Sequence, residues 1–238
     1  MRYFLLFLTL LVATNAQAEP EDQVKILKNS AAVLEEILDS PDEQIPAELI
    51  SNAKAIIVFP TMIKGGFMVA AQYGRGLATA RSPRTGEWSP PSFVTTVGGS
   101  FGLQIGAEAV DLILLVMSQR GLEGLLQDKF TLGGDIGVAA GPVGRHAEAG
   151  ADLMMQGEIY SYSRSKGVFA GLSLKGTIIA ADESYNREYY GAAHAPKEIL
   201  LDGKIKKYPE STRRFLKQLS RLAPAGKKPA LSAPPPSK

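Results

Sequence analysis

The segment IYSYSRSKGVFAGLSL, Ile159 to Leu174, gives the clearest indication of the fold. Residue alternation places Tyr160, Tyr162 and Arg164 on one face of a strand and three serines on the other. Ser165-Lys166-Gly167 supplies turn chemistry, and apolar residues alternate again from Val168 onward. This pattern predicts an antiparallel hairpin with one buried face and one face that is free to meet a partner.

Working outward from the hairpin, the period of two recurs through most of the chain. Strands are expected at 55–60 (ended by Pro60), 67–73, 93–105, 112–117, 130–140, 145–155, 158–164 and 168–180. Helical spacing or capping residues predict helices at 21–39, 46–52, 119–127 (capped by Ser118) and 209–222. Glycines spaced by four, at 98, 102 and 106 and at 133, 137 and 141, place each trio on one strand face and indicate strong curvature. We therefore expect an α+β fold: a curved, mainly antiparallel, glycine-rich sheet or partial barrel with N-terminal and C-terminal helices packed on it.

The first residues have the features of an export signal. Arg2 precedes an apolar run, Phe4 to Val12, and Ala16-Gln17-Ala18 is a small-residue cleavage pattern. Residues 1–18 are therefore predicted to be a signal peptide cut after Ala18, the alternative being an uncleaved membrane anchor. The 238 residues contain no cysteine, which excludes disulfides, thiol chemistry and a lipidated N-terminal cysteine. A periplasmic or secreted protein, associated peripherally with a membrane, is expected.

Charge is distributed unevenly along the chain. Residues 203–238 hold ten basic residues and one acidic residue, whereas 19–202 hold fifteen basic and twenty-three acidic residues. We therefore divide the chain into a domain at 19–202, a basic amphipathic tail helix at 203–222 and a disordered Pro/Ala/Lys-rich tail at 223–238. In the tail helix, Phe215 and Leu219 share an apolar side that is flanked by Arg213, Arg214, Lys217 and Arg221. This composition is typical of a helix at a membrane interface, and equally of a helix docked on its domain with a basic solvent side.

Motifs for catalysis or metal binding are weak. Gly98 to Gly102 matches G-x-S-x-G around Ser100, but it lies in a period-two run instead of a strand-to-helix elbow. His146, Glu148 and Asp152 share one face of a predicted strand, where they span about 20 Å and cannot all reach one ion. The sequence has no P-loop, dinucleotide fingerprint or paired CxxC. It therefore predicts no enzyme, no cofactor, no metal site and no nucleic-acid partner.

Several strings between Ala31 and Gly191 together resemble the SYLF domain family. They are AKAIIVFP, KGGFMVAAQYGRG, GEWSPPSFV, GGSFGLQIG, DLILLVM, FTLGGDIGVAAGPVG and IYSYSRSKGVFAGLSLKG, followed by YYG at 189–191. The resemblance implies a membrane-binding module of a family whose eukaryotic members recognise phosphoinositides and, in yeast, take part in actin regulation. In an exported bacterial form, it implies an anionic envelope lipid such as phosphatidylglycerol or cardiolipin. It also implies membrane contact by residues 21–39 and a head-group patch from basic residues in the matching strings: Lys64, Arg75, Arg81, Arg164, Lys166 and Lys175.

Residues and resemblance together predict an exported, non-enzymatic module that binds anionic phospholipid at an envelope membrane. The predicted contacts are the tail helix, through Arg213, Arg214, Phe215, Lys217, Leu219 and Arg221, and the patch named above. The alternative is an envelope protein-interaction scaffold without direct lipid binding, which would use sheet edges and the Tyr160/Tyr162 face. A hydrolase acting through Ser100 is a third hypothesis.

Overall fold

A single curled sheet forms the centre of the molecule in the computed structural model, which describes residues 19–38, 45–67, 69–101, 106–142, 157–165, 168–169 and 174–225. Its nine strands lie in the order β5-β9-β3-β2-β1-β4-β7-β6, with β8 paired to β7. The strands are β1 (Ala55–Phe67), β2 (Val69–Ala80), β3 (Ser92–Phe101), β4 (Gly106–Val116), β5 (Lys129–Thr131), β6 (Val138–Ala140), β7 (Ile159–Ser165), β8 (Val168–Phe169) and β9 (Ile178–Ala181). All pairs are antiparallel except β6 with β7. The predicted α+β class and the mainly antiparallel, curved sheet are confirmed.

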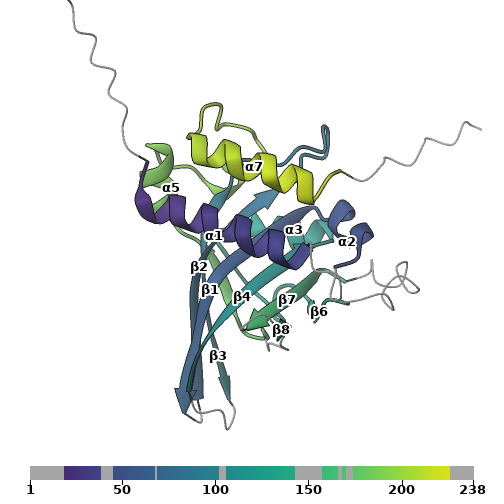
Figure 1. The fold of residues 1–238 in the computed structure, drawn as a ribbon, viewed down its shortest axis with the longest axis vertical. Coiled ribbons are helices and arrows are strands. Elements are labelled where there is room, and N and C mark those ends of the chain that lie inside the picture. The colour runs from purple at the N-terminus through teal and green to yellow at the C-terminus, as the bar shows by residue number, and fades with distance from the viewer. Residues whose placement is uncertain are drawn as a thin grey trace, which may run out of the picture.

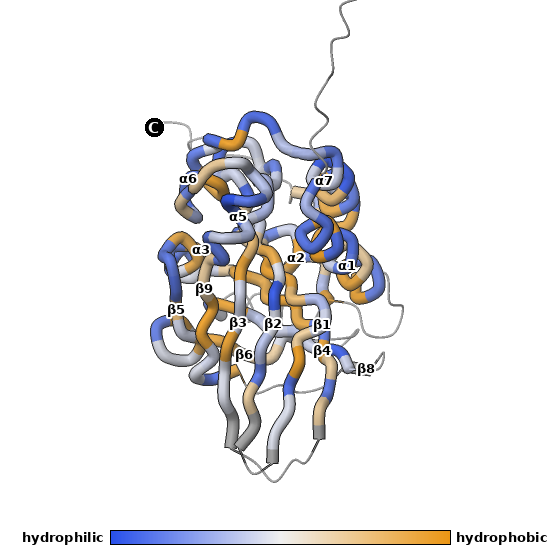
Figure 2. Tube along the Cα trace, turned by 90° about the vertical axis from the view of Figure 1, so that its left-hand side faces the viewer, coloured by the Kyte–Doolittle hydropathy of each residue, from blue (hydrophilic) through white to orange (hydrophobic). Residues whose placement is uncertain are grey.

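Helices cover both faces of this sheet (Figure 1). They are α1 (Glu21–Leu38), α2 (Ala47–Asn52), α3 (Gln119–Leu125), α5 (Glu183–Tyr190), α6 (Pro196–Leu200) and α7 (Glu210–Leu222). Two helix ends follow the chemistry of the sequence: Ser118 accepts a hydrogen bond from the Gly121 N–H at the start of α3, and Gly191 ends α5 with a left-handed φ of 74°. Helices α1 and α7 lie side by side in both views of the fold (Figures 1 and 2).

The two faces of the sheet carry separate cores. On the first face, which we call the α1 face, Ile56, Val58, Leu77 and Phe93 pack with side chains of α1, α2, α5 and α7. On the opposite face, strand residues such as Phe59 and Leu114 pack with Leu122 and Leu125 of α3 and Leu200 of α6. Central strands are buried on both sides, which explains near-continuous apolar runs such as Leu112 to Val116.

Strand β1 contains an irregularity that the sequence did not predict. Pro60 was expected to end the strand, but β1 continues to Phe67. Its pairing with β2 shifts between Val58 and Ile63, and its pairing with β4 shifts between Phe59 and Met62. The proline is tolerated because it lies in this bulge, where no ladder hydrogen bond from its nitrogen is needed. Thr61, beside it, has a φ of 67°, an unusual conformation for a β-branched residue, and its N–H donates to Asp111 Oδ1 at 2.9 Å.

Other sequence expectations are corrected by the turns. The strand predicted at 130–140 is divided into β5 and β6, because Gly133 adopts a φ of 72° in the intervening turn. Gly133 and Gly137 therefore do not share one strand face, and Gly102 lies outside the described residues. The predicted hairpin is confirmed, since Ser165 pairs with Val168. The Tyr160/Tyr162 face, however, is not free for a partner: the two side chains are 8% and 2% exposed within the α1-face core.

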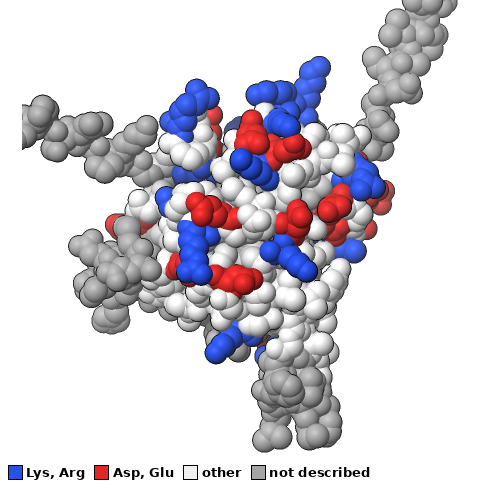
Figure 3. All heavy atoms as spheres, turned by 180° about the vertical axis from the view of Figure 1, so that it is seen from behind, with Lys and Arg blue, Asp and Glu red and all other residues white. Residues whose placement is uncertain are grey.

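The distal ends of β1 to β4 extend beyond the helices (Figures 1 and 2). We call this part the projection: residues 63–67, 69–75, 95–101 and 106–111. Its strands remain paired in the order β3-β2-β1-β4, as far as Phe101 with Val69 on one side and Gly66 with Gly106 on the other. Seen from behind, basic and acidic side chains interleave over the body of the molecule, above the projection (Figure 3).

Candidate functional site

The C-terminal helix α7 is packed into the domain. Phe215 and Leu219 are 3% and 1% exposed and belong to the α1-face core. The end of α7 is also fixed, because the indole nitrogen of Trp88 donates to the Ala223 carbonyl at 3.0 Å. Of the two alternatives for this segment, the structure therefore adopts the docked helix, and the apolar side chains of Phe215 and Leu219 are not available to a bilayer in this conformation.

Arg81 contacts the same C-terminal end of α7 and the Trp88 ring. Its guanidinium lies 4.0 Å from the Trp88 ring centroid and donates to the carbonyls of Ala53, Gly86 and Ala223. Desolvation by burial lowers its pKa to about 10. Arg81 therefore holds the end of α7 against the sheet instead of contributing an open cation.

The basic side of α7 faces solvent. Arg213, Arg214, Lys217 and Arg221 are all exposed. Glu210 accepts ion pairs from Arg213 at 3.1 Å and Arg214 at 3.5 Å. Such exposed pairs contribute little stability and exchange readily with other anions.

Acidic residues of α1 are neutralised across the same surface. Arg221 of α7 pairs with Glu35 at 2.7 Å, and Arg164 of β7 pairs with Glu36. The pairing of Glu35 and Glu36 leaves Lys25 and Lys28 as exposed cations on the first half of the helix.

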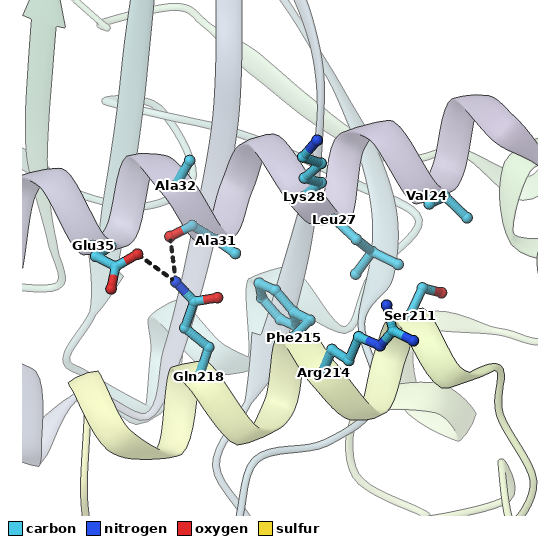
Figure 4. Close-up of a pocket in the computed structure, with 10 residues that line it drawn as sticks. All are labelled: Val24, Leu27, Lys28, Ala31, Ala32, Glu35, Ser211, Arg214, Phe215 and Gln218. Carbon is cyan, nitrogen blue, oxygen red and sulfur yellow. Dashed lines mark hydrogen bonds between the residues drawn. The ribbon is translucent and has the colours of Figure 1, made fainter.

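A groove of about 410 Å³ runs between α1 and α7 (Figure 4). Its floor is apolar and is formed by Val24, Leu27, Ala31 and Phe215. Lys28 on α1 and Arg214 on α7 line it from opposite helices (Figure 4).

The other end of the groove is closed by hydrogen bonds. Gln218 Nε2 donates to Glu35 Oε2 at 3.0 Å and to the Ala31 carbonyl at 3.3 Å (Figure 4). The groove therefore combines an apolar floor, two cations from facing helices and a polar end. This combination suits an anionic amphiphile, because acyl carbon and a phosphate require different surroundings.

The remaining predicted patch residues do not come together. Lys64 lies on β1 in the projection, Arg164 is paired with α1, and Lys175 is exposed beside the Gly176 turn. Lys166 lies outside the described residues.

Arg75 lies on β2 where α5 meets the projection. It pairs with Asp182 at 3.3 Å and lies 4.4 Å from the Tyr185 ring centroid. Desolvation by burial is the largest single effect and lowers its pKa, but Tyr73, Tyr185 and Asp182 together more than offset it, so that the pKa of Arg75 is raised. It therefore keeps its positive charge.

The alternative chemical motifs gain no support from geometry. Ser100 lies within β3, paired with Ala70 of β2, and not at a strand-to-helix turn. His146, Glu148 and Asp152 lie outside the described residues. In the part of the chain that the structure describes, no three His, Cys, Asp or Glu side chains gather as a metal site would require. Among the described helices, none combines the length and apolarity needed to cross a bilayer.

Fold and surface thus define an α+β domain with a helical layer that carries an amphipathic groove. A family model described as "Las17-binding protein actin regulator", Ysc84, matches residues 97–222. SH3 domain-containing YSC84-like protein 1 of Rattus norvegicus is 35% identical over 180 residues, which are 75% of this chain and 52% of the relative. LAS seventeen-binding protein 3 of Saccharomyces cerevisiae is 34% identical over 171 residues, 71% of this chain and 37% of the relative. The chain belongs to the Ysc84 family of SYLF-domain proteins and spans about half the length of the mammalian relatives it matches.

Sequence reasoning missed how the groove is assembled. Helical spacing predicts a helix at 21–39, and Phe215 is predicted to share the apolar side of a second helix. Their apposition was not predictable, because nothing in the sequence states that two amphipathic helices separated by about 190 positions cover the same sheet face. Lys28 was consequently absent from the predicted contacts.

Proposed function

We propose that this protein binds anionic phospholipid through the outer surface of the α1–α7 layer. The observation that carries the proposal is the groove itself, which joins an apolar floor to Lys28 and Arg214. A phosphate near these two cations would gain charge-assisted hydrogen bonds, while the adjoining acyl carbons would cover Val24 and Ala32, the apolar lining residues that remain accessible. The exposed cations of α7, including Arg213 and Lys217, extend the attraction along the membrane surface.

Electrostatics supplies the long-range part of this binding. Each basic residue near an anionic membrane contributes about 1 kcal/mol, and the effect decreases within a Debye length. The described segment 203–225 carries seven basic residues and one acidic residue, Glu210. Because the apolar side of α7 is buried, the helix attracts head groups without itself entering the bilayer.

The test is co-sedimentation with phosphatidylcholine vesicles that do or do not contain phosphatidylglycerol. The variant Lys28→Glu/Arg214→Glu should lose most of its anion-dependent pelleting. The matched control Lys129→Glu/Arg84→Glu makes the same change of charge at exposed positions outside the groove and should retain more. Equal losses in both variants would show that general charge, and not the groove, attracts the vesicle.

Removing residues 203–238 would be a poor test, because Phe215, Leu219 and Ala223 are part of the core. Charge variants avoid this difficulty, since all four substituted side chains are exposed. Unchanged circular dichroism and thermal unfolding would establish that each variant folds.

We propose further that the chain is exported, with residues 1–18 removed as a signal peptide, and acts at the periplasmic side of an envelope membrane. The Arg2, apolar-run and Ala16-Gln17-Ala18 pattern supports this. Mass spectrometry of the protein from the periplasmic fraction should find a chain beginning at Glu19. A full-length cytoplasmic chain would oppose the proposal.

A second candidate function is protein binding, favoured by the family description, "Las17-binding protein actin regulator", and by the yeast relative named LAS seventeen-binding protein 3. The projection, which lies apart from the groove, offers a surface for a protein. A purified partner that binds stoichiometrically without lipid, and equally to the Lys28→Glu/Arg214→Glu variant, would favour this reading.

A further inference from the structure

Four large apolar side chains, three on the projection and one on the adjoining strand β9, are exposed and form one line. Ile63, Tyr73, Val97 and Ile178 are 50%, 46%, 53% and 43% exposed. Ile63 pairs with Tyr73, Tyr73 with Val97, and Val97 with Ile178, so the four residues are direct neighbours across β1, β2, β3 and β9. We call them the apolar row. Direct pairing places all of them on the same face of the sheet.

That face is the α1 face. Tyr73 lies four residues from Leu77 on β2, and Val97 lies four residues from Phe93 on β3, both even separations. Leu77 and Phe93 are in the core covered by α1 and α7. The apolar row is therefore an uncovered continuation of the sheet face on which α1 and α7 lie.

The surroundings of the row are small and uncharged on the distal side. The next positions along the four central strands on this face are Ala107, Gly65, Ala71 and Gly99, which follow one another by direct pairing. The sequence contains no Lys, Arg, Asp or Glu in 65–74 or in 92–107. The described distal parts of β1, β2, β3 and β4, which belong to these stretches, thus lie together in the projection without a charged residue between 65 and 74 or between 95 and 101.

On the side nearer the helices, the row borders polar and charged residues. A hollow of about 370 Å³ lies between the N-terminal half of α1 and the sheet, lined by Ile63 and Tyr73 of the row and by Asp22, Lys25, Thr61, Arg75 and Tyr185. Arg75 is two residues from Tyr73 on the same face, about 7 Å along the strand. The strained φ of Thr61 at this rim is of the kind that proteins retain at functional sites.

We propose that the apolar row is the part of the protein that enters the interfacial layer of a lipid bilayer, with Arg75 held at the level of the head groups. This role of the row rests on the proposed membrane binding and identifies the apolar residues that would contact the bilayer. With this face of the sheet against the bilayer, the row and the Arg75 guanidinium both lie within the interfacial layer, which is about 7 Å thick on each side of a bilayer. Tyrosine at that depth is characteristic of membrane interfaces.

A bilayer fits this face better than a second copy of the chain. The row spans four strands, about 14 Å, and with its small-residue neighbours extends about 7 Å along them, which gives roughly 100 Å². A stable interface needs about 800 Å² per partner. A membrane has no such minimum, because the row adds to contacts that the helical layer on the same side already makes.

For the edges that the structure describes, backbone hydrogen bonding favours the interfacial layer over the hydrocarbon. β3 pairs with β9 only at 94–97 and β4 with β7 only at 111–116, so within the described residues the distal outer edges of β3 and β4 have no strand beside them. Unpaired backbone groups are costly in hydrocarbon but remain hydrated among head groups.

The experiment uses the absence of native cysteine. Val97→Cys and, as a matched control on exposed α7, Ser220→Cys are each labelled with an environment-sensitive fluorophore. Both are mixed with phosphatidylcholine vesicles with or without phosphatidylglycerol. The label at 97 should shift to the blue and be quenched by lipids that carry a quencher at the upper acyl chain, whereas the label at 220 should not be quenched. Tyr73→Ser/Val97→Ser should weaken vesicle binding about tenfold without altering thermal unfolding, whereas Ala139→Ser/Ala140→Ser at exposed β6 positions should not.

The outcomes separate the two proposals. Sedimentation with anionic vesicles and no change at 97 would overturn the role of the row and leave the groove proposal standing. A shift at 97 that is equal on neutral and anionic vesicles would support the row and remove the anionic preference. No sedimentation with either vesicle would remove both. A concentration-dependent dimer that Val97→Ser abolishes, with no vesicle response, would assign the row to self-association instead.

Discussion

Phe215→Ala tests whether α7 is an integral part of the domain. Phe215 is 3% exposed and packs in the core with α1. Truncating a buried phenylalanine to alanine costs about 3–5 kcal/mol, a large share of the roughly 5–15 kcal/mol that holds a typical domain together. With a urea dependence of about 2 kcal/mol per molar, the unfolding midpoint should fall by about 1.5–2.5 M.

The assay is urea unfolding followed by tryptophan fluorescence. Trp88 is the only tryptophan, and its indole donates to the Ala223 carbonyl just after α7, so its emission reports on this junction. Lys217→Ala is the matched control, because it changes an exposed residue two positions along the same helix and should stay within about 0.5 kcal/mol of the wild type. A loss below about 1 kcal/mol in Phe215→Ala would refute the docked arrangement and return α7 to the role of a detachable membrane helix.

Three further predictions concern stability. Arg81→Met removes the guanidinium that donates to Ala53, Gly86 and Ala223, and should cost about 2–3 kcal/mol with a red shift of Trp88 emission; an unchanged spectrum would contradict the assigned contacts. Thr61→Gly relieves a φ of 67° and, after the entropic cost of glycine, should raise stability by about 1 kcal/mol in thermal unfolding, whereas a loss would show that the threonine side chain stabilises the bulge. Burial raises the pKa of Tyr162 and Tyr190 above the ordinary 10.0, so the stability they contribute is present below pH 10 and is lost as the pH rises further. Phenolate absorbance and loss of ellipticity should therefore rise together above pH 10, and ionisation of these phenols in a fully folded protein would contradict their burial.

The sequence predicted the elements better than their contacts. Period-two alternation identified β2, β3 and β7, and Ser118 identified the start of α3, because these signals are local. The prediction that β1 ends at Pro60 was wrong. Proline ends most strands, and only the pairing of β1 with β2 and β4 shows that Pro60 lies in a bulge. The Tyr160/Tyr162 face was expected to be open, yet the sequence does not state that α1 and α7 return to cover it.

In the candidate site too, local features were predicted and contacts between distant segments were not. The basic side of α7 was predicted, because the spacing of Arg213 and Lys217 by four residues places them on one side of a helix. The groove and the apolar row were not, because both depend on which segments become neighbours. The uncharged stretches 65–74 and 92–107 were the available signal for the row, and their meaning becomes clear only once Tyr73 and Val97 are known to pair.

Vesicle co-sedimentation across a salt series tests the central claim most directly. The wild-type protein should pellet with vesicles that contain phosphatidylglycerol far more than with pure phosphatidylcholine, and the excess should disappear near 1 M salt, where the Debye length is about 3 Å. Negligible pelleting with both vesicles at low salt would contradict the account.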